Sequence, residues 1–330
     1  MRFGCSYFGC RITPHVEEDM RYLADNGFEF VVHVFTENDL KYCLGTMTDI
    51  VEVTHDAGLE VLIDPWGVLQ LFGGEAFSHW LNVYPEIKQV AQDGTPLPAA
   101  CPNNRKTLDL MTEWAYGAKK TGAEAFFWDE PHMYNPAWFK DNRDLHACFC
   151  PACQDRYKTY NHQPLPWNYD ETVEEFKKQS LTDFMFELGR LGRQCGMKNS
   201  VCLLPADLEG EGGLDWHTVA SMEDMDTFGS DPYWALKGQR PEVYVPREVR
   251  KVMSVCEKYK KDHLLWLQGF RIPAGHEDEV GRALDIMAAG DVQNVAFWGF
   301  KGCKYISEIA CDNPDEVWDL LVKKIKKYRS

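Results

Sequence analysis

Short, nearly continuous apolar runs alternate along the chain with longer segments in which apolar residues recur every three or four positions. The short runs have the length and composition of buried strands, and the longer segments have the rhythm of amphipathic helices. The predicted strands are residues 2–10, 28–35, 59–66, 125–128, 200–204, 225–234, 264–270 and 294–300. The predicted helices are residues 13–26, 37–57, 107–121, 170–195, 213–222, 245–261, 276–289 and 314–328.

Strict alternation of strand and helix, with strands that are apolar on both faces, indicates a parallel sheet covered on both sides. Eight such units in 330 residues favour an α/β fold of the (β/α)8, or TIM-barrel, type. An open doubly wound sheet is the alternative, but no Gly-x-Gly-x-x-Gly follows the first strand. Since no linker, repeat or low-complexity tract interrupts the pattern, we predict a single domain over residues 1–330.

Two segments depart from the alternation. Residues 67–106, with Gly73-Gly74 and the pair Pro96 and Pro98, are predicted to be an irregular functional excursion. Residues 131–169 follow the fourth strand and contain the motif Cys148-x-Cys150-x-x-Cys153, so we predict a loop insertion that carries a cysteine cluster.

The charge balance narrows the classes of partner. A formal net charge of −16 and a pI near 5.1 argue against nucleic acid and against an anionic membrane surface. The first ten residues lack a basic stretch followed by an apolar run, and no apolar stretch is long enough to span a bilayer. We therefore predict a soluble, cytoplasmic protein. A homo-oligomer is compatible with the sequence.

The cysteine motif is the most specific chemical signal. In a reducing compartment, clustered cysteines are better interpreted as metal ligands than as disulfides. Three thiolates in this spacing can bind one tetrahedral ion, and Cys101, in the proline-rich loop upstream, is the best candidate for the fourth ligand. His146 and His162 are alternatives. We predict a closed structural zinc site and no organic cofactor; the alternative is a group of ordinary free thiols.

The carboxyl ends of the strands carry the candidate catalytic groups, because in barrels of this kind the working residues lie there. We predict that Asp129, Glu130 and Asp231 are catalytic. Asp64 also ends a strand, and the alternative for Asp64 and Asp231 is that each caps the segment that follows. Successive side chains of a strand point to opposite faces, so Asp129 and Glu130 reach the same space only if the strand has already broken at Pro131.

Aromatic residues gather at the same level of the barrel. Sugar rings stack their C–H faces on aromatic planes, while their hydroxyls bind carboxylates, amides and histidine, so we predict a small-molecule carbohydrate as the substrate. The alternative is that the aromatic residues only fill layers of the barrel, although barrel cores favour Val, Ile and Leu. The candidate substrate-binding residues are His33, Asp64, Trp66, Tyr233, Trp234, Gln268, Arg271, Trp298 and Lys301.

The fourth strand, which ends in Asp129-Glu130 and is followed by an aromatic loop and the cysteine motif, resembles the family 42 β-galactosidases of glycoside hydrolase clan A. The resemblance covers roughly residues 100–160. It implies that Glu130 is the acid/base and that Cys101, Cys148, Cys150 and Cys153 bind a structural zinc. This chain departs from the pattern in two places. Gln268 stands where clan A enzymes have their nucleophilic glutamate, and Asp129 replaces an asparagine.

A second resemblance concerns two short strings. Phe-Trp-Asp129 and Gly-Ser-Asp231-Pro-Tyr are similar to the ends of strands four and six in the α-galactosidase-like enzymes of clan D. That resemblance implies an aspartate nucleophile at Asp129 and an aspartate acid/base at Asp231. In a retaining enzyme the two carboxyl groups lie about 5–5.5 Å apart, and in an inverting enzyme about 6.5–9.5 Å.

Three hypotheses about function follow. The first is a glycoside hydrolase that cleaves small glycosides or oligosaccharides with a pair of carboxylates. The second is a sugar-binding pseudoenzyme, which the amide at Gln268 favours. The third is a lyase or isomerase that acts on an anionic sugar gripped by Arg11, Arg271 and Lys301, although these residues can equally pair with surface acids.

Overall fold

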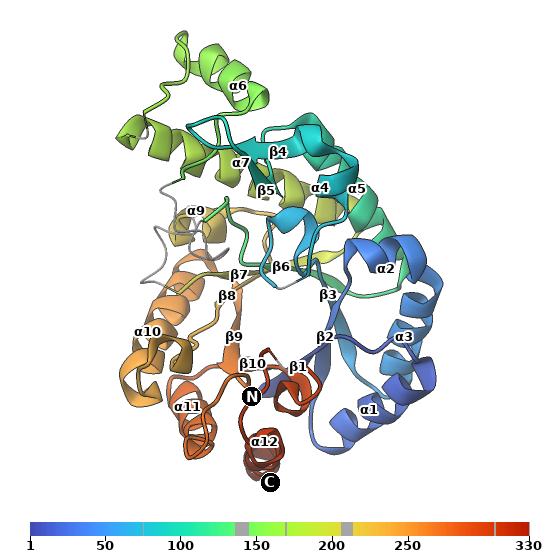
Figure 1. Ribbon diagram of the computed structural model, residues 1–330. Helices are drawn as coiled ribbons and strands as arrows, with labels where there is room; N and C mark the ends of the chain where they lie inside the picture. The colour runs from blue at the N-terminus through green and yellow to red at the C-terminus, as the bar shows by residue number, and fades with distance from the viewer. Residues whose placement is uncertain (75, 136–144, 169, 206–213, 307, 330) are drawn as a thin grey trace.

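The computed structural model describes all residues except 75, 136–144, 169, 206–213, 307 and 330. Eight parallel strands close into a barrel in the order β1-β10-β9-β8-β7-β6-β3-β2, which confirms the predicted (β/α)8 fold (Figure 1). The barrel strands are β1 (Arg2–Tyr7), β2 (Phe30–Val34), β3 (Glu60–Asp64), β6 (Ala125–Asp129), β7 (Lys198–Leu203), β8 (Thr227–Ser230), β9 (Asp262–Gln268) and β10 (Asn294–Trp298).

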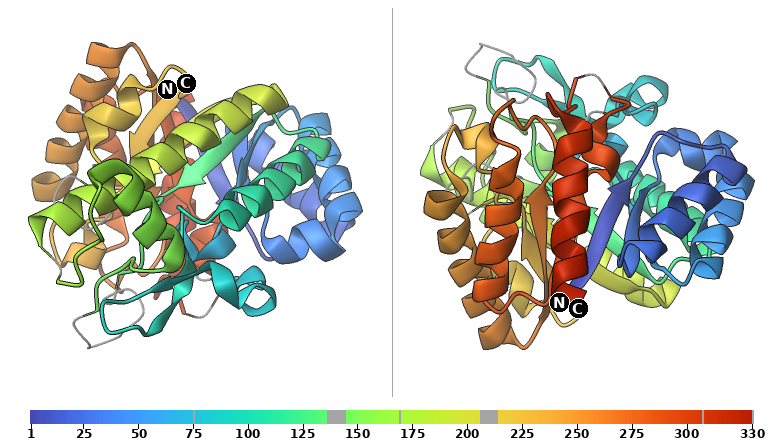
Figure 2. Two further views of the ribbon diagram at one scale, coloured as in Figure 1. Left: turned by 90° about the horizontal axis from the view of Figure 1, so that it is seen from above. Right: turned by 90° about the horizontal axis from the view of Figure 1, so that it is seen from below.

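Helices surround this barrel, as the views from above and below show (Figure 2). The predicted helix over residues 37–57 is two helices that meet at Cys43, and the one predicted over 213–222 begins at Trp216. The helices between the barrel strands and at the end of the chain are α1 (Thr13–Asp25), α2 (Glu37–Tyr42), α3 (Leu44–Asp56), α5 (Arg105–Lys120), α7 (Glu171–Cys195), α9 (Trp216–Ser221), α10 (Pro241–Tyr259), α11 (Asp278–Ala289) and α12 (Pro314–Arg329). Two 3₁₀ turns, η3 (Ala235–Lys237) and η4 (Phe300–Cys303), follow β8 and β10.

The barrel has two apolar layers because successive residues of each strand point to opposite faces. In β2, Phe30, Val32 and Val34 belong to the cluster that fills the barrel. Val31 belongs to the cluster between the strands and the helices. Both layers are buried, which explains why the strands read as continuous apolar runs in the sequence.

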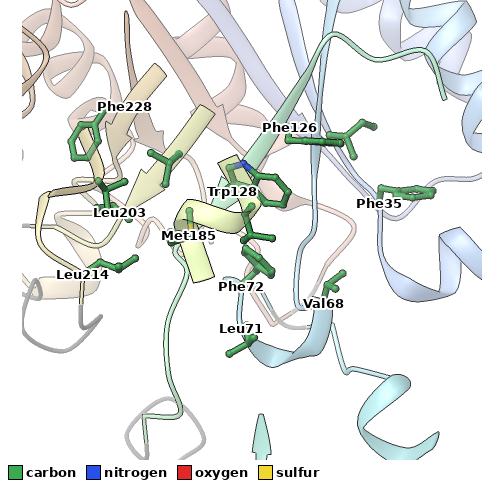
Figure 3. Close-up of a cluster of buried hydrophobic side chains, with 14 of the residues drawn as sticks. Phe35, Val68, Leu71, Phe72, Phe126, Trp128, Met185, Leu203, Leu214 and Phe228 are labelled. Atoms are coloured by element: carbon green, nitrogen blue, oxygen red, sulfur yellow. The ribbon is translucent and has the colours of Figure 1, made fainter. Parts of the chain in front are cut away.

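The outer layer is rich in aromatic contacts around Trp128 of β6. Its ring packs against Trp114 at 5.8 Å, Phe126 at 5.1 Å and Phe72 at 5.9 Å between centroids. Figure 3 shows Trp128 between Phe126 and Phe72. The indole N–H donates to the side-chain oxygen of Asn199 on β7 at 3.0 Å. Through its contact with Phe72, Trp128 therefore packs the segment of residues 67–106 against the barrel.

The segment predicted to be irregular contains regular structure, so that prediction was too coarse. Two antiparallel strands, β4 (Lys88–Val90) and β5 (Pro96–Ala100), form a hairpin, preceded by η1 (Val68–Gln70), α4 (Trp80–Val83) and η2 (Pro85–Ile87). Proline argues against a strand because it has no N–H to donate. Here Pro96 and Pro98 both lie on the exposed face of a sheet that has only two strands, where a missing donor costs little.

Glu37, at the start of α2, attaches this segment to the barrel. One carboxylate oxygen accepts the N–H of Leu69 at 2.8 Å and the hydroxyl of Ser78 at 2.7 Å. The other accepts the N–H of Trp80 at 2.7 Å. A buried carboxylate with this many donors is fully satisfied, so it can hold the loop in place without a counter-ion.

The hairpin also contacts the segment that follows β6 and carries the cysteine motif, which includes α6 (Pro151–Asn161). The N–H of Phe149 donates to the carbonyl of Val90 at 2.8 Å, and Ala91 forms a bridge with Ala147. The two segments therefore pack on one another at one side of the barrel, although the barrel strand β6 separates them in sequence (Figure 1). In the described residues, no helix combines the length and the apolar character that crossing a membrane requires.

Candidate active site and metal centre

A cavity of about 260 Å³ opens at the carboxyl ends of the barrel strands and is lined by Asp129, Glu130 and Asp231. A larger hollow of about 390 Å³ lies at the opposite end of the barrel, where Lys198, Asp262 and Asn294 begin their strands. We place the site in the smaller cavity, because the carboxyl-terminal face is where barrel enzymes carry their chemistry.

Asp129 and Glu130 both reach this cavity because the strand conformation ends at Asp129. Glu130 has a φ of 40°, in the left-handed region, and its N–H donates to the carbonyl of Cys202 at 3.0 Å. Alternation would send two neighbouring side chains to opposite faces. The turn at Glu130 removes that constraint one residue before Pro131, where the sequence had predicted the break. A residue other than glycine is uncommon at such a φ and is enriched at functional sites.

Gly73 lies directly against the two carboxylates. A β-carbon at this position would stand 2.7 Å from Oδ2 of Asp129 and 3.0 Å from Oε2 of Glu130. Its N–H donates to the backbone carbonyl of Asp129 at 2.9 Å. At Gly74, a β-carbon would stand 1.8 Å from the indole of Trp66. The Gly73-Gly74 pair therefore leaves the room that two acids and one tryptophan occupy at the edge of the cavity.

Asp231, one residue beyond β8, is 4% exposed. Burial raises the pKa of Asp231 well above its usual value, and the charge of Glu130 and a hydrogen bond to it raise this pKa further. Asp231 therefore carries a proton at pH values at which an ordinary aspartate is ionised. A carboxyl group in this condition can serve as a general acid near neutral pH.

Asp64, the last residue of β3, is fully buried. Burial raises its pKa as well, and the charge of Glu130 adds to the effect, whereas the backbone N–H of Trp66 opposes it. The N–H of Trp66 lies close enough to affect this pKa, but it does not reach either carboxyl oxygen of Asp64 in full hydrogen-bond geometry. It lies beside the acidic group without lining the cavity itself.

Aromatic side chains form the rest of the wall. Trp66 and Trp298 line the cavity with their ring centroids 6.4 Å apart, and Phe8 packs against both rings at 5.3 and 5.2 Å. Tyr233 and Phe270, also in the lining, meet edge to face at 4.9 Å. Flat apolar faces beside carboxylates are the surface that a sugar ring needs. Of these aromatic residues, Trp66, Tyr233 and Trp298 were named as candidates from the sequence, and Phe8 was not.

His33 does not lie at the cavity. It points to the outer side of β2, because Val32 and Val34 occupy the inner face. Its Nε2 lies 2.9 Å from the hydroxyl of Thr54 on α3, and burial lowers the pKa of His33 to about 3. The imidazole is therefore neutral and belongs to the packing between strand and helix.

Trp234 and Gln268 also lie outside the cavity lining. The indole N–H of Trp234, which is fully buried, donates to the carboxylate of Glu279 at 2.8 Å. Gln268 accepts the N–H of Ala235 and donates to the carbonyl of Phe270, both at 3.0 Å. Its amide links the segments that follow β8 and β9, so it holds these two segments together without lining the cavity.

Of the basic residues named from the sequence, Arg271 lines the cavity. Lys301 lies 3.2 Å from the carboxylate of Asp19 instead. Two further residues of the lining, Lys237 on η3 and Tyr244 on α10, had no signal in the sequence, because neither follows directly on a predicted strand.

The four cysteines of the predicted metal site come together. The sulfur atoms of Cys101, Cys148, Cys150 and Cys153 all lie within 4.8 Å of one another, and all four residues are buried. Cys101 follows β5, whereas the other three precede or open α6. Within the described residues, Cys101 completes the group, and His146 and His162 do not belong to it.

Two N–H groups donate to sulfur atoms of the cluster. The side-chain N–H of Asn103 donates to the sulfur of Cys153 at 3.2 Å and to the hydroxyl of Ser180 at 2.9 Å. The backbone N–H of Val90 points at the sulfur of Cys148 at 3.5 Å. Four converging sulfur atoms with N–H donors are the environment of a thiolate-bound ion, and a set of four soft ligands suits a tetrahedral metal such as zinc.

No family model matches the sequence, and no curated protein matches it either. Solved structures do match. An endo-β-1,4-mannanase from Thermotoga petrophila is 10% identical, with 100% of this chain and 77% of that chain covered and a TM-score of 0.62. An endo-1,4-β-mannanase from Rhizomucor miehei is 10% identical, with coverages of 99% and 94% and a TM-score of 0.62.

A D-psicose 3-epimerase is also similar, at 10% identity, with coverages of 100% and 98% and a TM-score of 0.52. Identities this low show a shared fold and no more. The barrel is thus common to enzymes of more than one reaction class, and the function has to be argued from the residues of this chain.

Proposed function

We propose that this chain is a glycoside hydrolase that cleaves small glycosides or oligosaccharides at the carboxyl-terminal mouth of its barrel. One observation carries the proposal: Asp129, Glu130 and Asp231 line the same cavity as Trp66 and Trp298. Carboxylates supply acid, base or nucleophile for the cleavage of a glycosidic bond. The indole rings offer planes on which a sugar can stack.

In this proposal Asp231 is the general acid that protonates the leaving oxygen. Its raised pKa, caused first by burial and then by Glu130, supports this role. Asp129, which reaches the cavity from β6, either attacks the anomeric carbon or removes a proton from the attacking water. Hydrolysis is balanced in both cases, since one water molecule is consumed and the proton that Asp231 gives up is restored from water.

Glu130 keeps Asp231 protonated through its charge and its hydrogen bond. This role differs from the family 42 resemblance, in which Glu130 itself is the acid/base. The pH profile of Glu130→Gln separates the two. Removal of the negative charge lowers the pKa of Asp231, so the alkaline loss of activity should begin at a lower pH while turnover persists. If Glu130 is itself the acid, turnover at neutral pH should instead fall by orders of magnitude.

The test of the proposal is turnover of aryl glycosides by the wild type and by Asp129→Asn and Asp231→Asn. Each variant should lose about 10³-fold or more in kcat, because one carboxylate of the reacting pair is replaced by an amide of the same shape. An activated leaving group needs little protonation, so it should partly restore Asp231→Asn and leave Asp129→Asn inactive. Full activity in both variants would refute the proposal.

The stereochemistry of the product tells which role Asp129 has. Retention of the anomeric configuration, followed by nuclear magnetic resonance during hydrolysis, indicates a covalent intermediate on Asp129. Inversion indicates that Asp129 activates water. The two outcomes correspond to carboxyl separations of about 5–5.5 Å and about 6.5–9.5 Å in the complex.

We also propose that Cys101, Cys148, Cys150 and Cys153 hold a structural zinc ion. The convergence of four buried sulfur atoms supports this, as do the N–H donors from Asn103 and Val90. Four protein ligands leave no open coordination position, so the ion would cross-link the hairpin of β4 and β5 to α6 and take no part in the chemistry.

A second candidate function is a sugar-binding protein without catalysis. The finding that favours it is at β9, where the amide of Gln268 is held by two backbone groups and no carboxylate is presented from that strand end. Calorimetry with a panel of monosaccharides distinguishes the two functions. Tight binding without product after long incubation with the corresponding glycosides would favour the binding protein.

A further inference from the structure

Three basic residues, Arg11, Arg271 and Lys301, follow the ends of β1, β9 and β10, and they differ in their interaction partners. Arg11 forms two hydrogen bonds with the carboxylate of Asp39, at 2.7 and 2.8 Å. Lys301 forms an ion pair with Asp19. Both charges are therefore neutralised within the protein. Arg271, which follows β9, is the exception, since no described carboxylate lies within ion-pair distance of it.

The backbone and the Nε of Arg271 are held in place by hydrogen bonds. It has a φ of 48°, in the left-handed region, and its backbone N–H donates to the carbonyl of Ile309 at 3.0 Å. Its Nε–H donates to the carbonyl of Glu308, also at 3.0 Å. A guanidinium group has five N–H donors, so the pair of terminal nitrogen atoms keeps four of them. The side chain is exposed at the mouth of the cavity, but this hydrogen bond orients its Nε, and its backbone conformation is uncommon for a residue other than glycine.

The position of Arg271 agrees with a role toward a ligand. It lines the cavity that also holds Asp129 and Glu130. In the barrel order, β8 and β7 stand between β9 and β6, so Arg271 and the two acids approach the mouth from well-separated strands. A ligand that fills the cavity would then meet carboxylates on one side and a guanidinium group on another.

We propose that Arg271 binds an oxyanion carried by the substrate, so that the preferred substrates are acidic glycosides. This inference rests on the proposed hydrolase function. Carboxylate, phosphate and sulfate groups all present two oxygen atoms at the spacing of a guanidinium fork. With a net charge of −16, the protein as a whole repels anions, so an acidic substrate needs such a local group to be bound.

The experiment measures kcat/KM for pairs of aryl glycosides that share one sugar configuration. One member of each pair is neutral, and the other carries a 6-carboxylate or a 6-phosphate; the two acidic arms tell which oxyanion is preferred. For the wild type the acidic member of one pair should be favoured. In Arg271→Ala the ratio of acidic to neutral kcat/KM should fall about 10- to 100-fold, through KM, because a charge-assisted hydrogen-bonded pair is lost.

Two variants sharpen the result. Arg271→Lys keeps the charge and loses the fork, so its ratio should lie between those of the wild type and Arg271→Ala. Arg250→Ala removes the same charge from the exposed side of α10, away from the cavity, and its ratio should equal that of the wild type. Added sodium chloride should lower the wild-type ratio and leave that of Arg271→Ala nearly constant.

Calorimetry keeps this inference separate from the proposed hydrolase activity. If no glycoside of the panel is cleaved, the hydrolase proposal fails, and the binding of free uronic acids and sugar phosphates against that of neutral sugars still tests Arg271. A preference for neutral ligands in the wild type, or the same ratio in the wild type and Arg271→Ala, overturns the inference whether or not glycosides are cleaved.

Discussion

The cysteine cluster and the acidic cavity both collect titratable side chains from distant parts of the chain, but they do so with opposite geometry. The four cysteine sulfur atoms converge within 4.8 Å of one another. The carboxylates surround an open volume of about 260 Å³. Within the described residues, the carboxylates do not form a comparable group around one point, since the cysteines alone meet that condition.

The difference shows how buried charge can be compensated in the cysteine cluster and in the acidic cavity. Converging thiolates would repel one another unless a cation lay between them, and on this ground we propose an ion there. The acids have no such compensation, and burial together with their mutual repulsion raises the pKa values of Asp64 and Asp231. In our proposal, the first arrangement lowers its energy by binding a metal, whereas the second keeps protons available for a ligand that enters.

The largest effect that would test this comparison is expected at the cysteines. Cys150→Ser should lose the metal and lower the free energy of unfolding by about 3 kcal/mol or more, because metal binding contributes directly to folding. Zinc content by mass spectrometry and urea unfolding check both effects. Cys43→Ser, a cysteine between α2 and α3, is the control and should keep the wild-type metal content. Equal zinc content in the wild type and Cys150→Ser would contradict the assignment.

A smaller effect is expected at the edge of the acidic cavity. In Gly73→Ala the new methyl group must displace the carboxylates of Asp129 and Glu130, which it would otherwise approach to 2.7 and 3.0 Å. We expect kcat/KM to fall about 10- to 100-fold with metal content unchanged, because catalysis is sensitive to displacements of about 1 Å. Gly45→Ala, where a β-carbon meets nothing within 4 Å, is the control. Wild-type kinetics in Gly73→Ala would place the reacting groups elsewhere.

The raised pKa of Asp64 predicts a pH dependence of stability. The folded state keeps a proton that the unfolded chain releases above about pH 4, so the wild type loses stability as the pH rises from there toward the folded pKa. Each pH unit over which the states differ by one proton changes the free energy by about 1.4 kcal/mol. Asp64→Asn removes the contribution of Asp64 to the pH dependence of the unfolding free energy.

Relative to the wild type, Asp64→Asn should therefore gain stability as the pH rises from about 4 toward the folded pKa of Asp64, as measured by urea unfolding at several pH values. Asp49→Asn, at an exposed position of α3, should follow the wild-type slope. A slope for Asp64→Asn that is indistinguishable from that of the wild type would show that Asp64 ionises as an ordinary surface acid.

The smallest effect is expected at Asn103, which connects the sulfur of Cys153 to Ser180 of α7. Asn103→Ala removes an N–H donor without removing a ligand. We expect metal release to a chelator to become up to about tenfold faster, with the metal still bound at the start. Release at the wild-type rate would mean that the hydrogen bond to sulfur does not stabilise the centre.

The sequence alone determined the barrel and the position of its mouth. The eight strands and the helices between them were recognisable because burial on both faces of a parallel sheet imposes continuous apolar runs, and those runs lie within a few residues of the observed strands. The same logic located Asp129 and Asp231 at strand ends. The spacing of Cys148, Cys150 and Cys153 could be read directly, because a metal motif is local in the chain.

Only the tertiary structure decided which of these residues meet. In the structure His33 points to the outer side of β2, and Gln268 forms hydrogen bonds with two backbone groups. Arg11 pairs with Asp39 and Lys301 pairs with Asp19, whereas Arg271 lines the cavity. These outcomes depend on distances between residues far apart in sequence, and on single backbone torsions such as that of Glu130. A pattern of residue types along the chain carries no information about either, because hydrophobic periodicity constrains burial and leaves the pairing of polar groups open.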